Sequence, residues 1–161
     1  MRKQSLFSKE RLVYWSDEFA DVVNLLTGKD AQGNATHPPV CSLNADAIAL
    51  AATVGIKNKR KREFGNGTRK EISTTTFATR GLEPYIFLVG LLGTAIPKAE
   101  ILRPDNEEQL IKEFEQYAAG GMEILRTEFS ENATNSADWV LERLFTEASN
   151  DPESKGIPRL I

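Results

Sequence analysis

The chain has 161 residues, of which 40% are hydrophobic and 27% charged, and this length and composition suit one soluble globular domain. The longest apolar run, 85–96, is shorter than the roughly 20 residues that cross a bilayer, and the first residues lack the apolar core of a signal peptide, so we expect a cytoplasmic protein without membrane contact. The single cysteine, Cys41, and single histidine, His37, exclude an intrachain disulfide and a zinc site of four Cys and His ligands.

The first third of the chain predicts one surface helix and one buried helix. Three early aromatic residues are expected to pack onto the body: Phe7, Tyr14 and Trp15. Ser16 is placed to cap a helix over 17–27 that Gly28 ends, and a loop over 28–43 follows. Asn44 is placed to cap the next helix, which Gly55 ends. That helix is apolar on nearly every side, so we expect it in the core.

The middle of the chain predicts little sheet and a second core helix. Ile72, Thr74 and Thr76 alternate weakly, which is consistent with a short strand or hairpin. Glu83 and Pro84 open a helix that is apolar all round and that Pro97 stops. We expect this helix to be the central one.

A long amphipathic helix is predicted to start at Asp105 as its N-cap, with Glu107 and Glu108 as solvated residues of its first turn. Its apolar stripe comprises Leu110, Phe114, Tyr117, Ala118, Gly121 and Leu125. Gly120 and Gly121 interrupt it, although each glycine costs about 1 kcal/mol relative to alanine. We interpret Tyr117, Gly120 and Gly121 as a structural motif in which the missing side chain at Gly121 lets another helix approach; a ligand or nucleic-acid contact is the alternative.

A last helix is predicted over 136–148, followed by a mobile tail over 151–161. The fold class expected is therefore mostly α: a single compact domain over 1–150, with about five helices and at most a short β-hairpin.

Charge is distributed unevenly along the chain. Residues 57–70 hold seven cations and one carboxylate, a local charge of +6, and because the whole chain carries −3 the remainder carries −9. The cations are Lys57, Lys59, Arg60, Lys61, Arg62, Arg69 and Lys70. Such a cluster neutralises DNA phosphates, so these residues are the candidate nucleic-acid contacts. Two alternatives stay open: docking on an acidic partner protein, and a solvated loop that contacts the acidic remainder of the same protein.

Recognisable catalytic motifs are missing. The sequence contains no GxxxxGK[ST], GxSxG, HExxH or CxxC pattern, and Cys41 and His37 flank two prolines without a third orienting group. We therefore expect a protein that is not an enzyme and needs no cofactor or metal, although a carboxylate-only metal site is not excluded by a single sequence.

Three segments together resemble a known family. They are ADAIALAATVGIKNKRKREF at 45–64, EPYIFLVGLLGT at 83–94 and FEQYAAGGMEIL at 114–125. The chain is similar to the dnd system-associated protein 4 family, also called DNA phosphorothioation-associated protein 4. The resemblance implies a small accessory component of bacterial systems that replace a non-bridging phosphate oxygen of DNA with sulfur and use the mark to tell self from foreign DNA.

The resemblance also implies binding partners, but it does not imply a catalysed reaction. DNA and the other proteins of the same defence system are the partners expected, and self-association is left open. No catalytic residues are carried over. Ala119 stands where relatives have Asn before the two glycines, which argues against a required polar side chain at that position.

Overall fold

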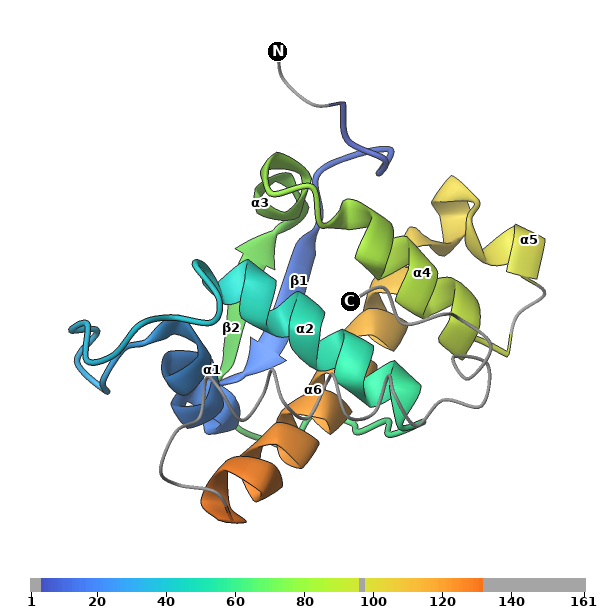
Figure 1. Cartoon of the computed structure of the whole chain (residues 1–161). Helices are drawn as coiled ribbons and strands as arrows, with labels where there is room; N and C mark the ends of the chain where they lie inside the picture. The colour runs from blue at the N-terminus through green and yellow to red at the C-terminus, as the bar shows by residue number, and fades with distance from the viewer. Residues whose placement is uncertain (1–3, 96–97, 132–161) are drawn as a thin grey trace, which may run out of the picture.

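The computed structural model describes residues 4–95 and 98–131. Its helices and strands, in chain order, are β1 (Leu12–Ser16), the 3-10 turn η1 (Asp17–Phe19), α1 (Ala20–Thr27), α2 (Asn44–Lys57), β2 (Arg69–Ser73), α3 (Thr74–Thr79), α4 (Glu83–Gly93), α5 (Lys98–Ile101), the 3-10 turn η2 (Pro104–Asn106) and α6 (Glu107–Glu131). In Figure 1, α2 crosses in front of the sheet, with α1 and α4 on opposite sides of it. The mostly helical fold class is confirmed.

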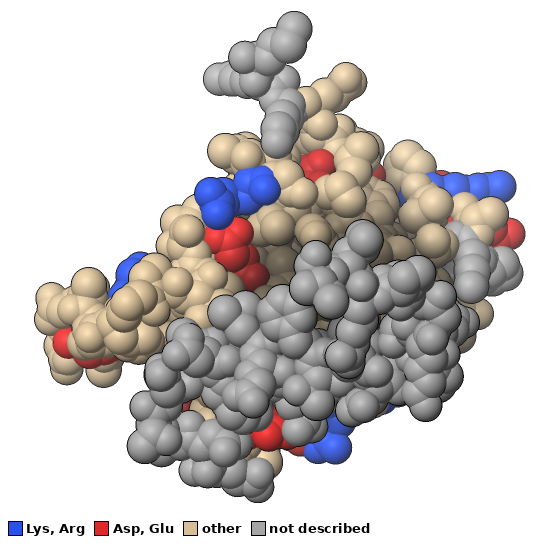
Figure 2. All heavy atoms as spheres, in the orientation of Figure 1, with Lys and Arg blue, Asp and Glu red and all other residues tan. Residues whose placement is uncertain are grey.

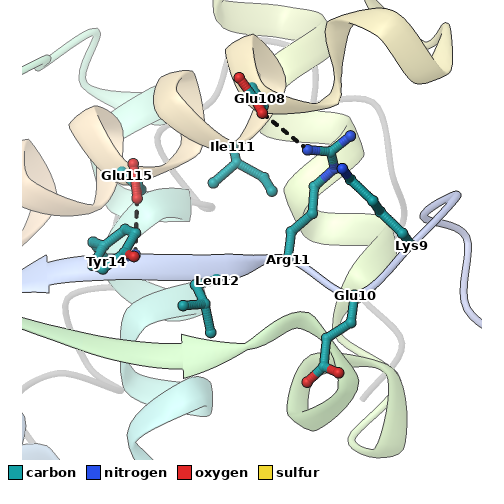
Figure 3. A pocket seen from close by; sticks show the side chains of 8 residues that line it. All are labelled: Lys9, Glu10, Arg11, Leu12, Tyr14, Glu108, Ile111 and Glu115. Atoms are coloured by element: carbon teal, nitrogen blue, oxygen red, sulfur yellow. Dashed lines mark hydrogen bonds and ion pairs between the residues drawn. The ribbon is translucent and has the colours of Figure 1, made fainter.

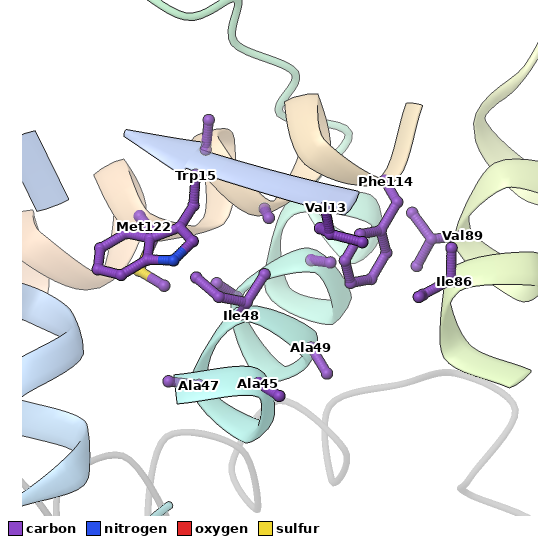
Figure 4. Packing of buried hydrophobic residues seen from close by; sticks show 14 of the residues in the cluster. Val13, Trp15, Ala45, Ala47, Ile48, Ala49, Ile86, Val89, Phe114 and Met122 are labelled. Atoms are coloured by element: carbon purple, nitrogen blue, oxygen red, sulfur yellow. The ribbon is translucent and has the colours of Figure 1, made fainter. Parts of the chain in front are cut away.

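The core forms where α2 and α6 pack together, because small residues on α2 let the helix backbones approach closely. Ala47, Ala51 and Ala52 are all buried, and Ile48 projects among them. Figure 4 shows Phe114 of α6 reaching the side chains of α4. The expectation that α2 lies in the core is confirmed.

The expectation that α4 is the central helix is wrong. Ile86 and Val89 are buried, whereas Leu88 is 50% and Leu92 54% exposed. An apolar surface on every side does not decide which helix takes the centre. The alanines of α2 permit the closest packing, so α2 takes that place and α4 packs with one face only.

The short strand or hairpin predicted around 72–76 is present as a short strand, β2, whose partner β1 is distant in sequence. β1 pairs antiparallel with β2, with Val13 opposite Ile72. The strand ends at Ser73, whose Oγ accepts from the Thr75 N–H at 3.1 Å and caps α3. Thr74 and Thr76 therefore lie in a helix, because a serine cap overrides the weak β propensity of three threonines.

Several helix ends differ from the sequence expectations. The N-cap of α2 is Leu43, not Asn44, and its N–H is bonded at 3.0 Å to the Asp46 carboxylate. Gly55 lies inside α2 and is buried, so it does not end the helix. A glycine that stops an isolated helix is tolerated inside a packed one, where its missing side chain is needed for a close contact.

The remaining ends shift by a few residues. Ser16 makes no side-chain cap, and η1 precedes α1. Asp105 falls in η2, and α6 begins at Glu107. Gly28 ends α1 in the left-handed conformation, at φ 72°, as expected. The predicted helix over 136–148 and tail over 151–161 lie outside the described residues. Within the described part of the chain, no helix is both long and apolar enough to span a bilayer.

Candidate nucleic-acid interface

The basic stretch, residues 57–70, leaves the C-terminus of α2 and crosses α6. Lys59 follows the helix end in the left-handed conformation, at φ 53°. The Arg60 N–H donates to the Gly55 carbonyl at 2.8 Å, and the Arg62 N–H donates to the Gln116 carbonyl at 3.0 Å. The backbone of the stretch is thus attached to both helices by hydrogen bonds that do not involve its charges.

The two adjacent glycines of α6 admit two different neighbours. A Cβ on Gly120 would overlap the carbonyl oxygen of Arg60, so this glycine makes room for the basic stretch. A Cβ on Gly121 would overlap the carbonyl oxygen of Ala51, so this one makes room for α2. The close approach of a helix at Gly121 is present, and Gly120 has a separate role that the apolar stripe did not indicate.

Tyr117, the third residue of the motif, lies at the same crossing. Its carbonyl oxygen occupies the space that a Cβ on Gly55 would need, and its ring fills the space beside Gly93. The ammonium of Lys61 lies 5.6 Å from the ring centroid. Tyr117 therefore packs between α2, α4 and the basic stretch, and its contacts are structural.

Several of the cations in the basic stretch are paired with carboxylates of the same protein. The pairs are Arg62 with Glu123 at 2.7 Å and with Glu18 at 3.1 Å, Lys61 with Glu113 at 2.5 Å, Lys70 with Asp17 at 3.2 Å, and Arg60 with Glu123. The hydrogen bond from Arg60 holds the pKa of Glu123 below its usual value. The acidic remainder of the chain thus folds onto the basic stretch, which is one of the alternatives that the sequence left open.

The other three cations are arranged differently. Lys59 is exposed and pairs with no carboxylate in the described residues. The guanidinium of Arg69 lies 4.9 Å from the centroid of the Phe64 ring, and Lys57 is exposed at the end of α2. Lys59 and Arg69 therefore present exposed positive charge that is not held in the ion pairs above.

Arg126 belongs to the same surface and was missed at the sequence level. Its guanidinium pairs with Asp21 at 2.6 Å and lies 4.8 Å from the Phe19 ring centroid. Arg62 lies over the same ring at 5.2 Å. Arg126 follows Glu123 by three residues, so helical spacing places it on the same side of α6, and that spacing was the available signal.

In the described part of the face that Figure 2 shows, the visible Lys and Arg side chains are scattered and do not gather into a patch.

A second feature is an open groove of about 440 Å³ between β1 and α6. Figure 3 shows Leu12 and Ile111 lying between two polar bridges, one from Arg11 to Glu108 and one from Tyr14 to Glu115. The Tyr14 N–H donates to the Glu115 carboxylate at 2.8 Å. Burial raises the pKa of Glu115 to about 7, against the lowering effects of this hydrogen bond and of Arg69 and Lys112.

Glu115→Gln is expected to stabilise the protein by about 1–2 kcal/mol at pH 8. The raised pKa means that the folded state binds a proton more tightly than the unfolded state. Wild-type stability from this group therefore falls as pH rises from about 4.5 to about 7, and the glutamine avoids the loss while keeping an acceptor for Tyr14. Urea unfolding of both proteins at pH 8 and pH 5 measures the difference in the free energy of unfolding. An equal gain at both pH values would contradict the prediction.

The only cysteine and the only histidine do not form a catalytic pair. Burial, with a smaller contribution from Asp46, raises the pKa of the Cys41 thiol to about 11. His37 Nε2 lies 2.8 Å from the Leu25 carbonyl oxygen, and its Nδ1 lies 3.0 Å from the Thr36 hydroxyl. Among the described residues, no group of three or more His, Cys, Asp or Glu side chains is placed to hold a metal.

Comparison with known proteins identifies a family. The model of a family described as DNA sulphur modification system-associated protein 4 matches residues 13–159. No curated protein and no solved structure matches the chain significantly.

Proposed function

Because this chain belongs to the DNA sulphur modification system-associated protein 4 family, we propose that it is a non-enzymatic accessory protein of a bacterial DNA sulfur-modification system that acts in defence against phage. In this proposal the protein contacts DNA through the basic stretch and works beside the other proteins of that system. The family description gives the association with the system, and the DNA contact is our inference from the charges.

The convergence of two parts of the basic stretch supports a DNA contact. Arg62 and Lys70 pair with the adjacent residues Glu18 and Asp17, so the middle and the C-terminal end of the stretch meet at η1. The seven cations of the stretch outnumber by two its own carboxylate, Glu63, and the four carboxylates that pair with it. That excess lies on a chain whose net charge is −3, so we expect a local and oriented contact.

Internal pairing does not prevent contact with phosphate. Exposed ion pairs contribute only about 0–1 kcal/mol each, because water and salt screen them. A DNA backbone presents closely spaced phosphates and releases condensed counterions when cations bind it. The cations of the exposed pairs can therefore exchange an internal carboxylate for a phosphate at a small cost in free energy. Lys59 has no carboxylate partner in the described residues to give up.

Binding of the purified protein to a short fluorescein-labelled DNA duplex is expected to be independent of sequence and to weaken steeply with salt. Lys59→Gln combined with Arg69→Gln should lower the affinity by about ten-fold and reduce the salt slope by about 2, as expected for two lost phosphate contacts. Fluorescence anisotropy across a salt series measures both quantities. These two substitutions leave the ion pairs of Arg60, Lys61, Arg62 and Lys70 in place.

The matched control is Lys29→Gln with Arg103→Gln, which removes two exposed charges away from the basic stretch. Equal losses in the two double variants would show that net charge, and not this surface, governs binding. Incubation of the same protein with plain and phosphorothioate DNA, Mg²⁺ or Mn²⁺ and ATP tests the non-enzymatic part. Cleavage or ATP turnover that disappears on mutation of one of its own carboxylates would contradict it.

Docking on an acidic partner protein is the second candidate. It is favoured by Arg62, which already holds two carboxylates, those of Glu18 and Glu123. If the wild-type protein fails to bind DNA at low salt yet binds another protein of the system, and the same cations are required, this second function replaces the first.

A further inference from the structure

The ion pairs that hold the basic stretch are of two kinds, because their carboxylates differ in burial. The Glu113 side chain is 7% exposed, and its partner Lys61 cannot leave without uncovering a buried charge. The Glu123 side chain is 30% exposed and holds Arg60, which is itself 55% exposed. Lys61 is therefore a fixed anchor, whereas the arginines on Glu123 are exchangeable.

Release of the two arginines from Glu123 would not require the stretch to move. The backbone is held by the hydrogen bonds of the Arg60 and Arg62 N–H groups to Gly55 and Gln116, and by the contact of Arg60 with Gly120. Only side-chain rotations are needed to turn the guanidinium groups from Glu123 toward a ligand.

Carboxylate and phosphate compete for the same arginine geometry. Both present paired oxygens that a guanidinium binds with two parallel hydrogen bonds. Glu123 receives one such donor from each arginine, at Oε1 from Arg60 and at Oε2 from Arg62. Both of its oxygens are thus occupied by the groups that a phosphate would bind.

We infer that Glu123 is an internal competitor of DNA phosphate, which keeps Arg60 and Arg62 occupied and sets the affinity of the basic stretch for DNA. This inference rests on the proposed function, since it concerns how the same surface is regulated. Glu123 acts through the two arginines and does not itself touch the DNA. A partner that draws Glu123 away would switch the surface to tighter DNA binding.

The test compares Glu123→Gln with Glu63→Gln on the same fluorescein-labelled duplex. Both variants remove one negative charge close to the stretch, but Glu63 is exposed and pairs with no cation in the described part of the chain. Glu123→Gln should raise DNA affinity by about three- to ten-fold and increase the salt slope by about 1, against less than about two-fold for Glu63→Gln. The glutamine keeps two polar atoms of the same size.

A second variant shows that the gain passes through the arginines. Arg60→Gln and Arg62→Gln, added to Glu123→Gln, should cancel the increase. If Glu123→Gln and Glu63→Gln have equal effects and the wild type still binds DNA, the role of Glu123 as an internal competitor would be overturned while the DNA contact would stand. Absence of DNA binding in wild type and in Glu123→Gln would overturn the DNA contact together with it.

Discussion

Gly121→Ala is expected to lower the free energy of unfolding by about 3 kcal/mol or more. The added Cβ would overlap the carbonyl oxygen of Ala51 and lie 3.0 Å from the backbone nitrogen of Gly55. Backbone atoms of a helix cannot rotate away as a side chain can, so α2 and α6 must separate and lose packing along their length. Urea denaturation followed by circular dichroism gives the change.

Gly67→Ala is the matched control, because an added Cβ at this exposed turn meets nothing within 4 Å. We expect a change within about 0.5 kcal/mol for it. The buried position also excludes the mild or stabilising outcome that an exposed helical glycine would give. A Gly121→Ala protein with wild-type stability would show that α2 and α6 do not cross at this residue.

Glu107→Ala is expected to destabilise the protein by about 2–4 kcal/mol, because it takes the closer of two carboxylates from a nearly buried arginine and leaves two donors of Ser8 without this acceptor. The Glu107 side chain is 4% exposed and pairs with Arg11 at 2.8 Å. It also accepts from the N–H and the hydroxyl of Ser8, at 2.7 and 2.8 Å. The sequence predicted a solvated residue here, and that was wrong.

The same contacts make this stabilisation dependent on pH. Burial acts to raise the pKa of Glu107, but the hydrogen bonds from Ser8 and Arg11 outweigh it, so the pKa lies below its usual value. The stabilisation is therefore complete above that usual value and is lost as pH falls through the lowered pKa. The difference between wild type and Glu107→Ala should shrink in urea unfolding at acid pH.

Glu108→Ala is the control that distinguishes the effect of burying a carboxylate from the effect of its charge. Glu108 neighbours Glu107 and also reaches Arg11, at 3.3 Å, but its side chain is 87% exposed. We expect a loss below about 0.5 kcal/mol from it at any pH. Equal losses for Glu107→Ala and Glu108→Ala would mean that the contact of the N-terminal segment with Glu107 does not stabilise the fold.

The sequence predicted only part of the candidate site. The composition of residues 57–70 identified the cations, since charge is a property of each residue alone. Which of them are paired depends on carboxylates of η1 and α6 that are more than forty residues away, at Glu18 for Arg62 and at Glu113 for Lys61. Arg126 was not predicted as part of the site, because its position beside Arg62 depends on the ring of Phe19, which is distant in sequence from both.

Local features determined the class of the fold. Hydrophobic periodicity, the glycine after α1 and the acidic first turn of α6 depend on residues within one or two turns of each other, and the resulting mostly helical chain follows from them. The family resemblance was likewise carried by short contiguous segments, and the family match covers residues 13–159.

Tertiary structure alone decided which helix is central, that β1 pairs with β2, and which neighbour Gly120 and Gly121 each make room for. α4 is the more hydrophobic helix, yet α2 takes the centre because alanines and Gly55 let its backbone meet α6. Val13 and Ile72 pair across nearly sixty residues. The free energy of such contacts depends on how closely two distant surfaces fit together, and the residues near either one in sequence do not contain that information.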